Sequence, residues 1–367
     1  MRVRNRRSRR RTRTEGGDVP RVMLTGAAGF IGSHIRDLLR QRGFEVIAVD
    51  AMIPEAHGFS AQPPDGVTPI DVTDTAALAD LLDGVDVVCH QAAMVGMGVD
   101  ASDAPLYARH NDLGTAAVLA AMTRTGCRRL VLASSMVVYG PGRLLTADGD
   151  PVHEIPTRRA EDARMGDFEY RSPDGRPISW ELTGEDAPLL PQSLYAASKV
   201  AQEHYAHAWA LSTGGSVIAL RYHNVYGPGM PRDTPYAGVA SIFRSRLAAG
   251  EAPLVFEDGG QMRDFIHVDD IAEANLAAVS SGIEGFSAVN VCSGQPVTIG
   301  AVADILSRTT GGPEPVYTGQ LRAGDIRHIV ADPAKARDVL GFAARIAPDQ
   351  GLGEFASAPL RESANAG

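Results

Sequence analysis

The sequence has no long apolar run. Of its 367 residues, 44% are hydrophobic and 22% charged, and no stretch of 18 or more apolar residues occurs. A membrane-crossing helix and a membrane partner are therefore not expected. The first twenty residues also contain no apolar segment of the kind found in secretory signals. The length suits a globular protein with one large domain and one smaller domain.

Cysteine is scarce as well. Only Cys89, Cys127 and Cys292 occur, far apart and without a C-x-x-C pair. Each lies in or beside an apolar segment, which favours buried thiols in a reducing compartment over a disulfide framework or a zinc site. We therefore expect a cytoplasmic protein without a bound metal.

Positive charge is concentrated at the N-terminus. Residues 1–20 contain eight Arg and carry a net +6, which leaves −15 on the remainder of a chain whose net charge is −9. An acidic body argues against nucleic acid as the main partner. We interpret residues 1–20 as a disordered basic tail, and a contact between this tail alone and nucleic acid is the less favoured alternative.

From residue 21 to residue 222, short β-branched runs alternate with longer segments of helical periodicity. This alternation predicts a parallel sheet covered by helices on both faces, an α/β fold of the Rossmann-type doubly wound class. The expected strands are RVMLT, EVIAV, VDVVCHQAA, RRLVLASS and SVIALRY, and the expected helices span 30–40, 75–82, 104–125 and 194–212.

A glycine-rich turn stands at the first strand-to-helix junction. In VMLTGAAGFIGSHI, Gly26, Gly29 and Gly32 are spaced G-x-x-G-x-x-G, which permits a tight turn and close approach of the backbone to a pyrophosphate. Asp50 ends the second strand, where its carboxylate would bond the adenosine ribose and repel a 2′-phosphate. The pattern predicts NAD, in preference to NADP, as the cofactor.

After residue 224 the pattern is interrupted by Gly and Pro, with helices expected near 237–249, 268–280 and 298–309. The predicted organisation is an NAD-binding Rossmann domain and a smaller C-terminal substrate-binding domain. The first spans 21–223, with its sheet also receiving 265–292, and the second consists of 224–264 and 293–360. Residues 141–191, rich in charge, Gly and Pro, form a loop insertion that we expect to overhang the site.

Tyr195 and Lys199, in SLYAASKVAQEHY, are four residues apart and so share one face of a helix. A tyrosine hydroxyl, with a pKa near ~10, is a poor base at neutral pH, and an adjacent ammonium group stabilises its ionised form. This spacing alone is common on solvated helix faces. Together with the glycine turn and with Ser135 at a strand end, it indicates a catalytic group.

These motifs together resemble the extended short-chain dehydrogenases/reductases, in the branch of NAD-dependent nucleotide-sugar epimerases and dehydratases. The resemblance covers residues 21 to about 356 and is carried by TGAAGFIG, DVTD, HQAA, ASSMVVYG, YAASK, LRYHNVYGPG, GGQMRDFIHVDD and LRAGDIRHIVAD. It implies an enzyme whose partner is a nucleoside-diphosphate sugar and whose catalytic residues are Ser135, Tyr195 and Lys199. Helices 111–125 and 194–212 resemble those that form the family's dimer interface, which implies a homodimer.

The resemblance also implies the ligand contacts. The cofactor-binding residues are Gly26, Gly29, Phe30, Ile31, Gly32, Asp50, Asp71, Val72, Ala92, Ala93, Asn111, Tyr195, Lys199 and Tyr222. The substrate-binding residues are Ser135, Met136, Asn224, Arg263, Arg322 and Asp325. Among these, the two arginines are implied at the diphosphate, and their planar guanidinium groups suit it because they donate in pairs to phosphate oxygens.

Met136 and Val137 directly follow Ser135. Family members that eliminate water typically carry an Asp-Glu pair there, and related decarboxylases usually keep a Glu; methionine and valine cannot transfer protons. The sequence therefore predicts an NAD-dependent 4-epimerase that forms a transient 4-keto sugar.

The choice of substrate and the rival reactions stay open at this point. The segments ASSMVVYG and RYHNVYGPGMPRDTPYAGVASIF most resemble those of the 4-epimerases of dTDP-L-rhamnose. A UDP-hexose is the other candidate substrate. A dehydratase, decarboxylase or oxidoreductase of the same family is the alternative. A non-catalytic dinucleotide sensor is disfavoured because Ser135, Tyr195 and Lys199 are all present.

Overall fold

The computed structural model describes residues 19–58, 61–96, 101–232, 238–321 and 325–361. Seven parallel strands form one sheet in the order β13-β8-β5-β4-β1-β2-β3. Their bounds are β1 Arg21–Thr25, β2 Glu45–Asp50, β3 Val67–Pro69, β4 Val87–His90, β5 Arg129–Ser135, β8 Ser216–Tyr222 and β13 Phe286–Val291. The predicted doubly wound α/β fold is confirmed.

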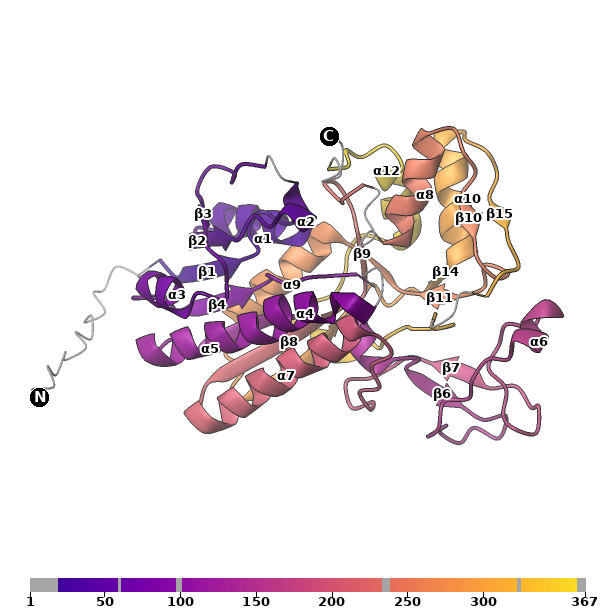
Figure 1. Cartoon of the computed structure of the whole chain (residues 1–367), viewed down its shortest axis with the longest axis horizontal. Coiled ribbons are helices and arrows are strands. Elements are labelled where there is room, and N and C mark those ends of the chain that lie inside the picture. The colour runs from indigo at the N-terminus through magenta and orange to yellow at the C-terminus, as the bar shows by residue number, and fades with distance from the viewer. Residues whose placement is uncertain (1–18, 59–60, 97–100, 233–237, 322–324, 362–367) are drawn as a thin grey trace, which may run out of the picture.

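Helices cover both faces of the sheet. Alternate residues of a strand point to opposite faces, and on β1 Val22 and Leu24 enter one hydrophobic core while Met23 enters the other. One face carries α1 Phe30–Gln41, α9 Val268–Ser280 and α11 Ala334–Leu340; the other carries α3 Thr75–Leu81, α5 Gly114–Thr125 and α7 Leu194–Thr213. Figure 1 shows α5 and α7 side by side.

The helix predicted over 104–125 is not regular. It consists of α4 Ala104–Tyr107, the π-helical segment η2 Ala108–Leu113 and α5, and it follows the short 3₁₀ turn η1 Ala101–Asp103. Within η2 the side chain of Asn111 bonds both backbone groups of Met94. The wider turn occurs where this buried amide is held, a feature that hydrophobic periodicity does not predict.

A second lobe has its own hydrophobic core, which includes Tyr226, Phe243, Phe265, Val302 and Phe355. Its helices are α8 Val239–Ala248, α10 Ile299–Thr310 and α12 Pro348–Phe355. Its two-stranded sheets pair β9 Asn224–Tyr226 with β12 Phe265–His267, β10 Leu254–Val255 with β15 Val316–Tyr317, and β11 Met262–Arg263 with β14 Val297–Thr298. Figure 1 shows the lobe beyond the ends of the large sheet.

The predicted domain boundaries need two corrections. Of the segment 265–292, β13 joins the large sheet, but β12 pairs with β9 instead. Residues 334–342, predicted in the substrate domain, pack through Ala336 and Phe342 into the core beneath the large sheet. Both differences arise because the chain crosses between the lobes more often than the change in composition indicates.

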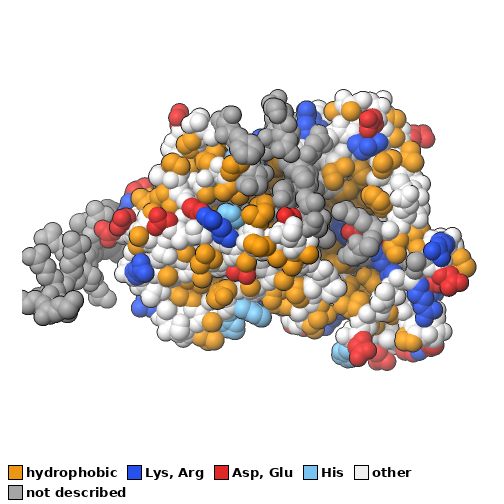
Figure 2. Space-filling model, in the orientation of Figure 1, with side chains coloured by type: hydrophobic (Ala, Val, Ile, Leu, Met, Phe, Trp, Pro, Cys, Tyr) orange, Lys and Arg blue, Asp and Glu red, His pale blue; other side chains and the backbone are white. Residues whose placement is uncertain are grey.

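The insertion, residues 141–191, is more ordered than a loop. Strands β6 Arg143–Leu145 and β7 Ser179–Glu181 form an antiparallel pair, and α6 Ala160–Arg164 lies between them in sequence. Leu144, Tyr170 and Ile178 form a small apolar cluster of its own. Figure 2 shows charged side chains gathered over this part of the molecule.

Two short helical segments complete the structure, α2 Pro54–His57 and the 3₁₀ turn η3 Met136–Tyr139. In the part of the chain that the structure describes, no helix combines the length and the apolarity needed to cross a membrane. Nearly all of the predicted basic tail, residues 1–18, lies outside the described residues.

Candidate active site

The glycine turn lies between β1 and α1, as predicted. Gly26 has a φ of +68°, and a Cβ at this position would lie 2.7 Å from the backbone nitrogen of Ala92. A Cβ on Gly32 would lie 2.0 Å from the carbonyl oxygen of Gly26. Only glycine therefore lets this turn approach both the end of β4 and the first turn of α1 so closely.

A cavity of about 540 Å³ opens beside this turn, at the carboxyl ends of the parallel strands. It brings together segments far apart in sequence and includes most of the predicted cofactor-binding residues: Gly26, Gly29, Phe30, Ile31, Gly32, Asp50, Val72, Ala92, Ala93, Tyr195, Lys199 and Tyr222. We call it the larger cavity. Its position agrees with the rule that open α/β sheets bind ligands outside the carboxyl ends of their strands.

Asp50 ends β2 and lines the larger cavity with a largely buried carboxylate. It accepts hydrogen bonds from the backbone nitrogens of Ala28, at 3.0 Å, and Met52, at 2.9 Å, and it pairs with His57 at 3.2 Å. Burial opposes its ionisation, but the hydrogen bonds from His57 and the backbone outweigh this effect and lower the pKa. Asp50 is therefore a carboxylate in the site.

Two predicted cofactor residues do not line the larger cavity. Asp71 accepts hydrogen bonds from the backbone and hydroxyl of Thr73 and pairs with Arg109 at 3.2 Å. The amide of Asn111 is fully buried, bonded to Met94 and to the Ser198 hydroxyl at 2.8 Å. Asp71 shapes its own turn, and Asn111 positions α7. That these two residues bind the cofactor stays a prediction.

The structure brings the three predicted catalytic residues together. Tyr195 hydrogen-bonds Ser135; burial raises the pKa of Tyr195 to about 12, and this bond acts in the opposite direction. Lys199 Nζ lies 5.8 Å from the centre of the Tyr195 ring and donates to the carbonyl oxygen of Ala133 at 2.9 Å. Burial lowers the pKa of Lys199 to about 7. A tyrosine hydroxyl thus lies beside a serine hydroxyl and a buried amine.

A buried ion pair supports the catalytic helix, one turn beyond Lys199. Glu203 receives two hydrogen bonds from Arg221 of β8, at 2.9 and 2.8 Å, and one from Ser134 at 2.5 Å. Arg221 also donates to the hydroxyl of Tyr139 at 2.8 Å. This network fixes α7 against β5 and β8. Sequence reasoning missed it, although both residues lie in the quoted segments SLYAASKVAQEHY and LRYHNVYGPG, because only the fold brings them together.

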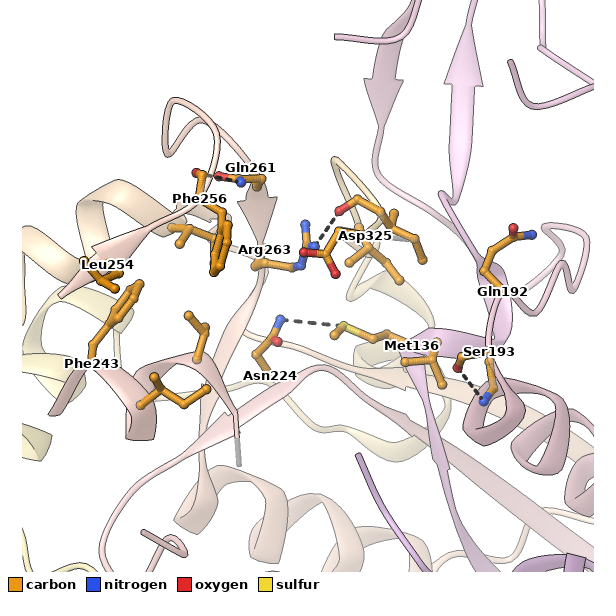
Figure 3. A pocket seen from close by; sticks show the side chains of 17 residues that line it. Met136, Gln192, Ser193, Asn224, Phe243, Leu254, Phe256, Gln261, Arg263 and Asp325 are labelled. Atoms are coloured by element: carbon orange, nitrogen blue, oxygen red, sulfur yellow. Dashed lines mark hydrogen bonds between the residues drawn. The ribbon is translucent and has the colours of Figure 1, made fainter. Parts of the chain in front are cut away.

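A second cavity of about 310 Å³ adjoins the first and extends under the second lobe. We call it the smaller cavity. Met136, Val137 and Asn224 line both cavities. Figure 3 shows Phe243, Leu254 and Phe256 on one side, Gln192 and Ser193 on the other, and Arg263, Asp325, Asn224 and Met136 between them.

Arg263 lines the smaller cavity, but its guanidinium is engaged by backbone. It donates to the carbonyl oxygens of Met262 and Arg327, both at 2.9 Å, and Ile326, at 2.6 Å. Burial lowers its pKa to about 10. Its predicted partner Arg322 lies outside the described residues.

Asn224 is held in place at the junction of the two cavities. Its backbone nitrogen and side-chain amide both donate to the carbonyl oxygen of Asp264, at 3.0 and 3.1 Å. Burial raises the pKa of Asp264 to about 6, although its carboxylate accepts backbone hydrogen bonds from Ser293 and Gly294. The predicted substrate residue therefore stands at the start of β9, where β9 pairs with β12.

Several residues in or beside the cavities were not predicted. His57 and Arg361 line the larger cavity, and Arg361 donates to the carbonyl oxygen of Ala28 at 3.0 Å. His223 lines it as well, and burial lowers the pKa of its imidazole to about 3. No spacing in the sequence links these residues to the glycine turn.

The residues present fit NAD. The two glycines where a Cβ would clash allow close approach of a pyrophosphate, and Asp50 lies at the strand end that faces the adenosine ribose in folds of this class. Within the described ranges, no three His, Cys, Asp or Glu residues group in a way that could hold a metal ion.

Comparisons with known proteins agree with this geometry. Residues 22–292 match the model of the NAD dependent epimerase/dehydratase family. The dTDP-L-rhamnose 4-epimerase of Burkholderia thailandensis is 33% identical over 349 residues, covering 92% of this chain and 94% of the relative.

Solved structures show the same likeness. MoeE5 in complex with UDP-glucuronic acid and NAD is 31% identical, with a TM-score of 0.73 and coverage of 91% of this chain and 97% of that one. The UDP-glucose 4-epimerase of Thermotoga maritima with UDP-glucose is 27% identical, with a TM-score of 0.73 and coverage of 92% and 97%. The chain therefore belongs to the NAD-dependent epimerase/dehydratase family, and NAD is confirmed as its cofactor.

Proposed function

We propose that the chain is a 4-epimerase of a nucleoside-diphosphate sugar. The observation that carries the proposal is the pair Met136 and Val137, which line both cavities next to Ser135. An apolar pair at the junction of the cavities cannot supply the second acid and base that elimination of water requires. It leaves room for a keto sugar to turn between the two hydride-transfer steps.

NAD would be held by the glycine turn, Asp50 and Lys199, and when bound it supplies the hydride acceptor and, after reduction, the donor. Tyr195 takes the proton of the sugar C4 hydroxyl, and Ser135 hydrogen-bonds the same oxygen. When the amine of Lys199 is protonated, its positive charge stabilises the ionised form of Tyr195. After the sugar has turned, Tyr195 returns the proton, so each turnover leaves the enzyme unchanged.

The smaller cavity is proposed to take the nucleotide portion of the substrate. Aromatic and aliphatic side chains at one end suit a nucleobase, and Arg263 and Asp325 lie in the middle of the view with Asn224 and Met136 (Figure 3). The relative from Burkholderia thailandensis acts, by its name, on dTDP-L-rhamnose. We propose dTDP-L-rhamnose or a UDP-hexose as the substrate.

The test is a panel of dTDP-, UDP- and GDP-sugars incubated with the purified protein without added cofactor and followed by NMR. We expect one pair of 4-epimers to interconvert catalytically. A requirement for stoichiometric NAD or NADH would identify an oxidoreductase instead, and loss of water or of carbon dioxide would identify a dehydratase or a decarboxylase.

We further propose a homodimer that associates through η2, α5 and α7. Leu113, Tyr205 and Leu211 on these elements are at least half exposed, and Figure 2 shows mostly hydrophobic and uncharged side chains on this face. Sedimentation equilibrium tests the proposal, and a monomer would refute it. The three buried cysteines carry free thiols, which supports a cytoplasmic location.

A further inference from the structure

The insertion was expected to overhang the site, but none of its residues lines either cavity. Instead it packs against segments of the second lobe that do. The backbone nitrogen of Thr183 donates to the carbonyl oxygen of Val330 at 3.1 Å, and that of Asp332 donates to the carbonyl oxygen of Thr183 at 3.1 Å. The insertion therefore runs alongside the segment 325–332, which begins in the smaller cavity.

Arg158 makes the first side-chain connection. Its side chain is 8% exposed, and its guanidinium donates to Glu257 Oε1 at 2.7 Å and to the carbonyl oxygen of Asp325 at 2.6 Å. Asp325 lines the smaller cavity, and so does Phe256, the residue before Glu257. One side chain of the insertion thus fixes two separate parts of the cavity wall.

Glu169 makes the second connection. It accepts a hydrogen bond from Arg327 Nη2 at 2.7 Å and pairs with His328 Nε2 at 2.7 Å. Arg327, only 2% exposed, also donates to Glu257 at 2.8 Å. Arg327 follows Ile326, another lining residue of the smaller cavity. A buried ion pair breaks at a high cost, because the remaining charge is left without compensation.

The backbone at Glu257 shows that this connection imposes a conformation. Glu257 has a φ of +56°, in a region that residues other than glycine adopt rarely. Its carboxylate is 1% exposed and is shared by Arg158 and Arg327. A backbone of this kind persists only where its surroundings determine it, and here the surroundings include a side chain of the insertion.

We propose that the insertion is a positioning element for the nucleotide portion of the substrate. Through Arg158 and Glu169 it holds the two segments that carry Phe256 and Asp325 in the smaller cavity. The inference rests on the proposed function, in which this cavity takes a nucleoside diphosphate. It assigns no chemical step to the insertion and predicts an effect on substrate binding, not on cofactor binding.

The test measures binding of UDP and of dTDP by calorimetry to the full-length, NAD-containing protein. The variants are Arg158→Met, Arg158→Lys, Glu169→Gln and the control Arg176→Ala. Arg176 belongs to the insertion, and among the described residues it pairs with Asp148 and Asp174, which are exposed and also lie in the insertion. Released NAD and hydrogen exchange over residues 325–330 are measured on the same samples.

We expect Arg158→Met to weaken nucleotide binding by about tenfold or more, because two charge-assisted hydrogen bonds are lost. Arg158→Lys should lose less, and Arg176→Ala should stay within about twofold of wild type. Hydrogen exchange over residues 325–330 should become faster in Arg158→Met but not in Arg176→Ala. The NAD content of both variants should stay unchanged.

Wild-type nucleotide affinity in Arg158→Met, or weaker binding without faster exchange over 325–330, would overturn this inference and leave the proposed function standing. If Arg158→Met does not fold, Glu169→Gln decides by the same two readouts. A wild-type protein that binds neither nucleotide would instead overturn the proposed function and, with it, this inference.

Discussion

The two cavities are built in different ways. The larger one lies at the ends of long parallel strands, and its shape depends on backbone positions such as Gly26 and Gly32, where a Cβ would clash. The smaller one is lined by α8, short strands and loops of the second lobe together with Met136 and Val137 of η3, and ion pairs of Arg158 and Arg327 hold some of its segments in place. Backbone geometry therefore defines the cofactor side, whereas a side-chain network defines the substrate side.

The largest effect should come from the proposed base, which lines the larger cavity. Tyr195→Phe removes the only proposed base while retaining the ring, so turnover should fall by about 10²-fold or more, with NAD still bound. NMR of the epimers and quantification of NAD released on denaturation check this. Tyr317→Phe, at an exposed tyrosine of β15, is the control; substantial activity in Tyr195→Phe would remove Tyr195 as the base.

A single added methyl group should disrupt the glycine turn of the larger cavity. In Gly32→Ala the new Cβ would lie 2.0 Å from the Gly26 carbonyl oxygen, so we expect a loss of about 1–3 kcal/mol of stability together with NAD. Thermal unfolding and NAD content measure both. Gly282→Ala is the matched control, because a Cβ there meets nothing within 4 Å. Full NAD occupancy in Gly32→Ala would contradict the account of the glycine turn.

Cofactor choice should change less. Asp50→Ser removes the carboxylate that faces the ribose, so the ratio of NADP to NAD released from purified protein should rise by about tenfold, equivalent to about 1.4 kcal/mol. Glu45→Ser, at the exposed start of the same strand, should leave the ratio unchanged. An unaltered ratio in Asp50→Ser would show that other residues exclude the 2′-phosphate.

The smallest effect concerns the ion pairs behind the smaller cavity. Burial opposes ionisation of Glu169, but its bonds to His328 and Arg327 outweigh this and lower the pKa. The carboxylate therefore stabilises the folded chain at neutral pH, and the contribution is lost as pH falls through the folded-state pKa.

Glu169→Gln should consequently reduce the melting temperature near pH 7, and the difference from wild type should shrink as pH falls below about 4. We expect less than about 1 kcal/mol because Glu169 is partly exposed. Glu181→Gln, on the exposed part of β7, is the control. A difference that grows on acidification would contradict the assigned direction of the pKa.

The difference between a cavity defined by backbone geometry and one held by side-chain contacts also explains what the sequence could predict. The order of strands and helices, the glycine turn and the group of Ser135, Tyr195 and Lys199 follow from local periodicity and short motifs, and the structure places them together. A motif of this kind reflects what the local backbone requires. It can therefore be recognised in the sequence without knowing which distant segments pack against it.

The rest depends on contacts between distant segments. The pair of Glu203 with Arg221 and the connection of Arg158 to Asp325 join residues with no shared pattern. The side chains of Asp71 and Asn111 are bonded to neighbouring protein groups, and no pattern in the sequence indicates these contacts. Position in a motif did not reveal which way a side chain faces.

The central claim, a reaction in which hydride leaves and returns without elimination, is tested most directly by turnover in D₂O. The account predicts that NMR shows the 4-epimer accumulating with protium retained at C4 and C5, because the hydride returns to the carbon it left and Met136 and Val137 cannot remove a proton from C5. Deuterium at either carbon, or a product lighter by one water, would contradict it.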